Sequence, residues 1–371
     1  MRPSRKPSKT VKYAAIPLLI ASIVLTTGSR WGFASEKKPH GVGSRFLVLD
    51  DCDDDNIIKT APYGDTISLM DSRGKLLKVV TRGLRITSKG GGLSVSEDGR
   101  FFAVCEQSSN TLSVYETASG GKLWDLMGFF SSAVFAKGLV YATGAENVFA
   151  IDDTATIIKH VRFGGLDMAA DPAHDALWLV GLDVKKFNLD LELQFKTRLT
   201  LSHLNTGAFS VDVNPDGSVW IAERNPYDKH GSKNRLVKRS PDGGILQAID
   251  LAFCPRCVRV DKSNGSVWTT GKIEGKRDFS KIGDDWPDTL GEFYHLTKTA
   301  EKTFTQKFDS EGKRLLSIPK CGESLIVDPF DGSVWITAKK AIWHVSSTGE
   351  KLDTYTGDTN SPKWLALIPN S

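Results

Sequence analysis

Five aspartates fall within residues 50–55, and side chains of this kind can hold a metal ion. Carboxylate oxygens are the ligands that calcium prefers in proteins. The run lacks the glycine and the terminal glutamate of an EF-hand loop. Two interpretations stay open: a calcium site formed by Asp50, Asp51, Asp53 and Asp55, and an acidic loop that is merely solvated.

Cys254 and Cys257 form a Cys-x-x-Cys pair in a chain that has five cysteines. In an exported chain, an odd number leaves at least one thiol outside any internal disulfide. A disulfide or close structural pair is one interpretation, and a redox or metal site is the other. A redox pair usually sits at the N-terminus of a helix in a strand–helix–strand unit. No such unit surrounds these cysteines, so we favour a disulfide or a close structural pair at Cys254 and Cys257.

Other polar and aromatic side chains suited to binding lie between apolar, strand-like segments. The sequence has no His-Glu-x-x-His, no phosphate loop and no Gly-x-Ser-x-Gly nucleophile elbow, so no catalytic residue is assigned. His344 lies inside a predicted strand, and we expect it to be structural. The candidate binding residues are His203, Glu223, Arg224, Tyr227, His230, Asp284, Trp286 and His295.

A repeated motif indicates the scaffold that positions these residues. Asp-Gly-Ser-Val-Trp occurs at 216–220 and again at 331–335, and 264–268 differs only by Asn for Asp. Each copy follows a short apolar segment and precedes two more, separated by glycine-containing turns. Four short antiparallel strands at a period near 40 residues are typical of a propeller blade.

The spacing of such units predicts an all-β fold, a seven-bladed β-propeller, with six blades as the alternative. Units begin near residues 92, 131, 165, 207, 256 and 324, and those at 131 and 165 are the least regular. The N-terminal unit, from residue 45, lacks its first strand. Residues 364–370 have the pattern of that strand, so we expect the C-terminal strand to pair with the N-terminal blade and close the ring.

In a propeller, two kinds of connection leave the ring on the same face: those from the second to the third strand, and those from the fourth strand to the next blade. The irregular segments beginning at Asp50, at Glu223 and at Lys272 are all connections of the first kind. Long loops on a rigid scaffold are the usual place for binding residues. The sequence therefore predicts one functional face.

Residues 1–34 have the pattern of a secretory signal peptide. They hold six basic residues and no acidic one, and an apolar run from Ala14 to Leu25 precedes small residues. The run is shorter than the roughly 20 residues of a membrane-spanning helix, which favours a cleaved signal peptide. An uncleaved N-terminal anchor is the alternative. We expect a polar lead-in at 35–44, a propeller at 45–371, and a periplasmic or extracellular location. Membrane association would come only through residues 1–34.

The charge balance argues against nucleic acid as a partner. Without residues 1–34, 42 basic and 44 acidic residues remain, a formal charge of −2. Binding to nucleic acid would need a basic face with interleaved aromatic residues. We therefore expect a protein, glycan or small-molecule ligand.

The segments at 211–223 and 326–337 resemble the repeats of NHL-type propellers and of streptogramin B lyase-like propellers, over roughly 207–357. The first family implies a binding platform. The second implies a magnesium-assisted lyase that uses His and Glu on the central face, whereas the matching strand ends here carry Glu223, Gly271 and Lys339. We therefore expect a non-enzymatic exported propeller that binds a ligand or protein through one face. A metal-dependent lyase or lactonase is the alternative.

Overall fold

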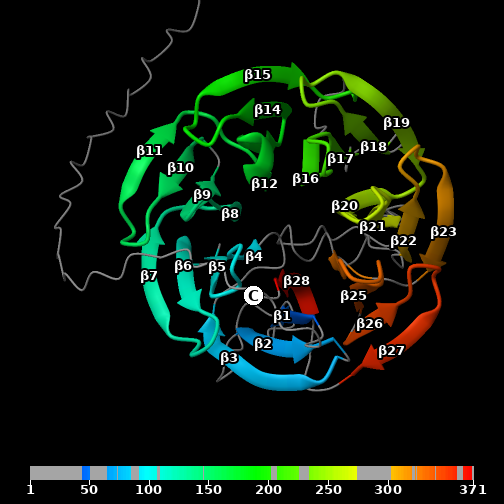
Figure 1. Ribbon diagram of the computed structural model, residues 1–371, viewed down its shortest axis with the longest axis horizontal. Helices are drawn as coiled ribbons and strands as arrows, with labels where there is room; N and C mark the ends of the chain where they lie inside the picture. Colours follow the sequence, from blue (N-terminus) through cyan, green and yellow to red (C-terminus); the bar gives the residue numbers. More distant parts are fainter. Residues whose placement is uncertain are drawn as a thin grey trace, which may run out of the picture. The chain divides into compact units, whose positions relative to one another are not determined.

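The computed structural model describes residues 44–50, 65–72, 74–84, 92–106, 109–144, 146–201, 207–224, 234–273, 302–319, 322, 324–338, 340–356 and 362–369. They belong to one compact unit, Ala34–Ser371. The described strands form seven four-stranded antiparallel sheets arranged in a ring (Figure 1). The predicted seven-bladed propeller is thus confirmed.

Each blade has an innermost strand near the axis and an outermost strand at the rim (Figure 1). From the innermost strand outward, the blades comprise: in blade 1, β28 (Pro362–Ile368), β1 (Arg45–Asp50), β2 (Asp65–Asp71) and β3 (Leu76–Leu84); in blade 2, β4 (Leu93–Val95), β5 (Phe101–Glu106), β6 (Thr111–Glu116) and β7 (Lys122–Met127); in blade 3, β8 (Ser132–Ala136), β9 (Leu139–Thr143), β10 (Val148–Ile151) and β11 (Ile157–Val161); in blade 4, β12 (Asp167–Asp171), β13 (Ala176–Val180), β14 (Asp183–Phe187) and β15 (Leu193–Arg198); in blade 5, β16 (Gly207–Val213), β17 (Val219–Arg224), β18 (Asn234–Arg239) and β19 (Ile245–Leu251); in blade 6, β20 (Cys254–Val260), β21 (Val267–Ile273), β22 (Lys302–Phe308) and β23 (Arg314–Pro319); in blade 7, β24 (Leu325–Val327), β25 (Val334–Ala338), β26 (Ala341–Val345) and β27 (Lys351–Tyr355).

The ring closes as the sequence predicts. β28 supplies the innermost strand of blade 1 and pairs antiparallel with β1, with Leu367 opposite Phe46 and Leu365 opposite Val48. Because β28 pairs along the length of β1, the inner edge of β1 is covered.

The repeated motif forms the turn between the innermost and second strands, and turn chemistry explains its residues. The Asp216 carboxylate accepts a hydrogen bond from the backbone N–H of Ser218 at 2.9 Å, and Asp331 does the same for Ser333 at 2.8 Å. Gly217 and Gly332 have φ angles of +78° and +69°, which favour glycine. The Asp-Gly pair thus fixes the turn that places the following Val and Trp on the second strand.

The tryptophans of the second strands are fully buried, and each faces a basic residue on the third strand. Trp178, Trp220 and Trp268 lie 5.5, 5.7 and 5.1 Å from the ammonium groups of Lys186, Lys238 and Lys307. These lysines donate to backbone oxygens in the next blade, at distances of 2.8, 3.3 and 2.9 Å.

In blade 7 a histidine replaces this lysine. His344 stacks on Trp335 with ring centroids 4.0 Å apart, and its Nε2 lies 2.9 Å from Ser333 Oγ. His344 is therefore structural, as expected. Apolar side chains of neighbouring blades also pack together, for example Leu49 with Phe102 and Trp220 with Val258. The core thus lies in the seams between the blades.

The two faces of the ring differ in their connections. Turns between the innermost and second strands, and between the third and outermost strands, share one face, which we call the turn-bearing face. Six of the seven third-to-outermost turns have the same backbone hydrogen bonds, such as Gly243 N–H to Ser240 O and Ser240 N–H to Gly244 O, and the turn of blade 2 is one residue longer. The opposite face, the loop-bearing face, carries the connections from second to third strands and from each blade to the next. Several of these are much longer, above all 51–64, 225–233 and 274–301.

Candidate binding surface

Few of the residues that the sequence singled out for the loop-bearing face fall in the described ranges. Glu223 and Arg224 end β17 on that face, and Asp50 ends β1 on the same face. The other binding and metal candidates lie outside the described residues and stay predictions: His203, Tyr227, His230, Asp284, Trp286, His295, Asp51, Asp53 and Asp55.

Glu223 is fully buried, which corrects its expected role as a surface binding residue. Its Oε2 accepts hydrogen bonds from Thr200 N–H at 2.9 Å, Thr200 Oγ1 at 2.5 Å and Leu201 N–H at 3.2 Å. Its Oε1 lies 3.9 Å from the Arg239 guanidinium, which is also buried. Burial raises the pKa of Glu223, although these partners lower it. The carboxylate therefore fixes the connection between blades 4 and 5.

Arg224 contacts side chains of the innermost strands of blades 5 and 6. Its guanidinium carbon is 3.3 Å from the centre of the Phe209 ring, a cation–π contact, and its Nη1 is 3.9 Å from Cys254 Sγ. Arg224 is partly exposed, so it remains a candidate for binding on the loop-bearing face.

No disulfide joins Cys254 and Cys257 in this structure. A β-bulge separates Pro255 from Cys257 on β20. Cys254 Sγ lies beside Arg224 of blade 5, whereas the Cys257 thiol donates to Leu325 O of blade 7 at 4.0 Å. The two sulfur atoms thus point toward opposite neighbouring blades. Burial raises the pKa of Cys257, so this thiol favours its protonated, unreactive form.

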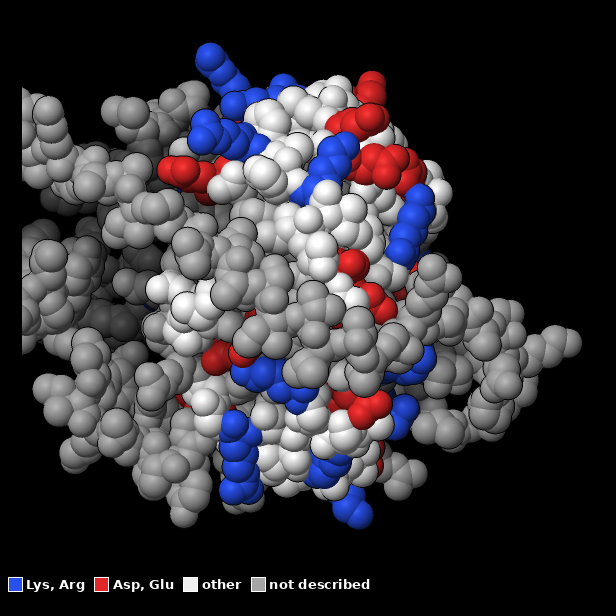
Figure 2. Space-filling view, turned by 90° about the vertical axis from the view of Figure 1, so that its left-hand side faces the viewer, with Lys and Arg blue, Asp and Glu red and all other residues white. Residues whose placement is uncertain are grey.

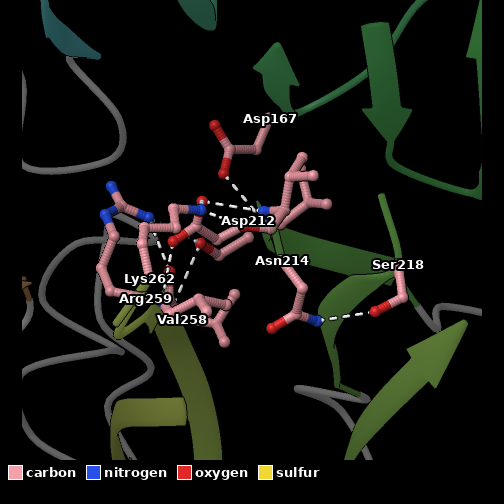
Figure 3. A network of polar contacts seen from close by, with 11 residues as sticks. Asp167, Asp212, Asn214, Ser218, Val258, Arg259 and Lys262 are labelled. Carbon is pink, nitrogen blue, oxygen red and sulfur yellow. Dashed lines mark hydrogen bonds and ion pairs between the residues drawn. The ribbon is translucent and has the colours of Figure 1, made fainter. Parts of the chain in front are cut away.

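A network of polar side chains connects the innermost strands of blades 3 to 6 around the axis (Figure 3). The Asp167 carboxylate accepts from Ser132 Oγ at 2.9 Å and from Val211 N–H at 3.2 Å. Asp212 repeats this one blade on, accepting from Val260 N–H at 2.7 Å and from Lys262 Nζ at 2.9 Å. Each carboxylate therefore satisfies the free edge of the next innermost strand.

Arg259 supplies a second positive charge to this network, beside that of Lys262. Its Nη1 donates to Val258 O at 2.7 Å and lies 3.5 Å from Ser210 Oγ (Figure 3). The charge of Arg259 lowers the pKa of Asp167, but burial raises it by more, so the net shift is upward. The carboxylate oxygens of this network already accept hydrogen bonds from backbone N–H groups, from a serine hydroxyl and from Lys262. Its role is therefore to hold the innermost strands together.

The upward shift gives a test at Asp167. A carboxyl with a raised folded-state pKa contributes stability that is present at low pH and is lost as pH rises from its ordinary value, 3.8, through the folded value. Asn cannot titrate, so the stability of Asp167→Asn relative to the native protein should increase as pH rises from about 3.5 to 7. Urea unfolding of both proteins across that range measures this, and a pH-independent difference would contradict it.

A hollow of about 290 Å³ lies in the seam between blades 2 and 3. Its walls come from the end of β7, from the connections 128–131 and 144–147, and from β10 and β11. The side chains that shape it are Leu126, Met127, Phe129, Phe149, Ile157 and Glu146. Both connections belong to the loop-bearing face. We call this hollow the blade 2/3 groove.

Other site types find no support among the residues that the structure describes. Within those ranges, no group of three or more His, Cys, Asp or Glu could hold a metal ion. On the side of the ring seen in Figure 2, basic and acidic residues are interspersed. The described part of the chain contains no helix that could cross a membrane.

Comparison with solved structures shows the fold. The chain is similar to a putative 6-phosphogluconolactonase from Bacteroides fragilis, with 12% identity over 90% of this chain and 100% of that one, and a TM-score of 0.58. The β-propeller domain of Cps50 (Swd1) from Myceliophteria thermophila gives 8% identity, 76% and 91% coverage, and a TM-score of 0.54. BamB from Moraxella catarrhalis gives 12% identity, 82% and 84% coverage, and a TM-score of 0.51.

At these identities the likeness shows a propeller and nothing finer. No protein-family model matches the sequence, and no curated protein does either. The resemblance to NHL-type and streptogramin B lyase-like propellers therefore stays a prediction.

Two features of the structure escaped the sequence analysis. The network of polar side chains around Asp167 and Asp212 depends on which residues of neighbouring innermost strands lie side by side. The repeated motif alone does not predict that alignment. The blade 2/3 groove was missed because Met127 and Phe129 look like ordinary core residues. Their signal is positional: they end an outermost strand and enter a connection on the loop-bearing face.

Proposed function

We propose that this protein is an exported β-propeller that binds a protein partner through its loop-bearing face. One observation carries the proposal: the long, dissimilar connections leave the ring on one face, while the opposite face carries short and regular turns. Variation confined to one face of a rigid scaffold is the arrangement expected of a recognition surface.

The comparisons are compatible with this proposal. Propellers commonly serve as protein-binding scaffolds, and the similar structures include BamB and Swd1. Export is supported by the basic and apolar pattern of residues 1–34. A protein or glycan ligand would also suit the weakly acidic composition of residues 35–371.

The connection 274–301 allows a clean test, because the strands on either side are paired up to their ends. Ile273 lies opposite Lys302, so a two-residue Asn-Gly turn can replace the connection without disturbing the hairpin. The replacement variant should keep its melting temperature and lose the partner that the native protein captures by crosslinking in its host. Full retention of that partner would contradict a role for this connection.

The lyase or lactonase alternative is tested separately. Lactones and cyclic esters are supplied to the native protein with magnesium or calcium, and hydrolysis is followed against a metal-free control. We expect no metal-dependent turnover. Turnover that depends on the metal would overturn the proposal of a non-enzymatic platform.

A further inference from the structure

The blade 2/3 groove is surrounded by apolar side chains that remain in water. Met127 is 79% exposed, Phe129 is 52% exposed and Ile157 is 41% exposed, and all three line the same hollow. Single exposed apolar residues are ordinary, but a cluster around a concave surface is typical of an interaction site. A hollow of about 290 Å³ suits one or two large side chains.

The walls of the groove are held in place by hydrogen bonds and packing. Gly128 N–H donates to Asn110 O at 2.7 Å, and Ser131 N–H donates to Thr143 O at 2.7 Å. Behind the surface, Phe130 is buried and meets Phe149 edge to face with centroids 5.7 Å apart. A preformed pocket spares the ligand the cost of ordering the site.

The charge at the groove selects its occupant. Among the described residues that line the groove, Glu146 is the one ionisable residue, and it is exposed. On the neighbouring strand β7, the charge of Asp125 is balanced by Lys122 at 3.2 Å. A ligand side chain beside Glu146 therefore gains most from a positive charge.

We propose that the blade 2/3 groove anchors a segment of a protein partner in which a large apolar side chain stands next to a lysine or arginine. The apolar side chain enters the hollow between Phe129 and Ile157, and the basic group pairs with Glu146. The inference rests on the proposed function and names the chemistry of the partner at one place on the rim of the ring, which runs from the connections 128–131 and 144–147 of the loop-bearing face to Ile157 at the start of β11. A buried apolar anchor with a charged rim is the usual anatomy of such contacts.

The test uses displayed random peptides selected on the full chain. Peptides with an aromatic or aliphatic residue beside Lys or Arg should be enriched, and synthetic copies should bind the native protein measurably. Ile157→Asp should weaken binding about tenfold or more, an amount that corresponds to about 1.4 kcal/mol. The matched control is Leu352→Asp, at a similarly exposed aliphatic residue of blade 7, and it should leave binding unchanged.

A charge reversal makes the test sharper. Glu146→Lys should weaken the basic peptide and strengthen a version with Glu in place of the basic residue. The proposal is overturned if no peptide is enriched, if enriched peptides bind Ile157→Asp as well as the native protein, or if the charge reversal has no effect. Melting temperatures of all variants show that each is folded.

Two results would assign the groove to another occupant and would also overturn the proposal. If sedimentation shows a dimer that Ile157→Asp dissociates, the occupant is a second copy of this chain. Binding of apolar peptides without any charge preference would mean a nonspecific apolar site. Neither result would contradict the proposed function, because that function is tested separately by the replacement of 274–301, at a different part of the loop-bearing face.

Discussion

A variant that ends at residue 361 should fail to fold into a closed ring. It lacks β28, so blade 1 loses its innermost strand and the inner edge of β1 is left open. Leu365 and Ile368, both buried, pack in the two seams that flank blade 1. Removing one such side chain costs about 2–5 kcal/mol, and domains are stable by only about 5–15 kcal/mol. Circular dichroism should show no cooperative unfolding transition, and size-exclusion chromatography should show aggregation.

The control moves the strand instead of removing it. Ile368 lies opposite Arg45, so residues 362–369 can be joined to Ser44 through a short turn in a chain that ends at residue 361. This variant has the same strands in the same places and should regain cooperative unfolding. A truncated protein with the native melting temperature would show that β28 does not hold the ring closed.

Replacing Glu223 by Ala should destabilise the protein by about 3–5 kcal/mol, because the change leaves a buried Arg239 without its counter-charge. It also removes the acceptor for the N–H groups of Thr200 and Leu201. Urea unfolding at neutral pH measures the loss.

Glu192→Ala is the matched control, since that carboxylate is exposed on a third-to-outermost turn of blade 4 and should cost less than about 1 kcal/mol. Adding Arg239→Met to Glu223→Ala should restore part of the stability, because no unpaired charge then remains buried. A loss below 1 kcal/mol for Glu223→Ala would contradict the structural role assigned to this carboxylate.

Much of the fold could be predicted because the blade is a local unit repeated along the chain. The Asp-Gly-Ser-Val-Trp copies revealed turn and strand together, and the strand missing before Arg45 was found again after residue 361. Such features depend on short-range turn chemistry and on the alternation of apolar residues.

The site was harder to predict because burial is set by neighbouring blades. Glu223 lies at a strand end on the expected face, yet the connection at Thr200 and Leu201 covers it. The spacing of Cys254 and Cys257 suggested a bridge, but the bulge in β20 turns their sulfur atoms toward different blades. Neither the connection that covers Glu223 nor the bulge in β20 can be predicted from a pattern in the local sequence.

Two exposed apolar residues on opposite faces allow a direct test of binding through one face. Leu182 is 83% exposed on the loop-bearing face, in the connection from β13 to β14, and lies outside the blade 2/3 groove. Phe330 is 70% exposed on the turn-bearing face, in the turn from β24 to β25. Replacing each in turn by a photo-crosslinking phenylalanine analogue places equivalent probes on the two faces.

The decisive measurement is the crosslinking of these two proteins in the host cell, followed by mass spectrometry of the products. Binding through the loop-bearing face predicts one discrete partner crosslinked from position 182 and none from position 330. A partner crosslinked from position 330 and absent from position 182 would contradict the proposal that this protein acts through its loop-bearing face.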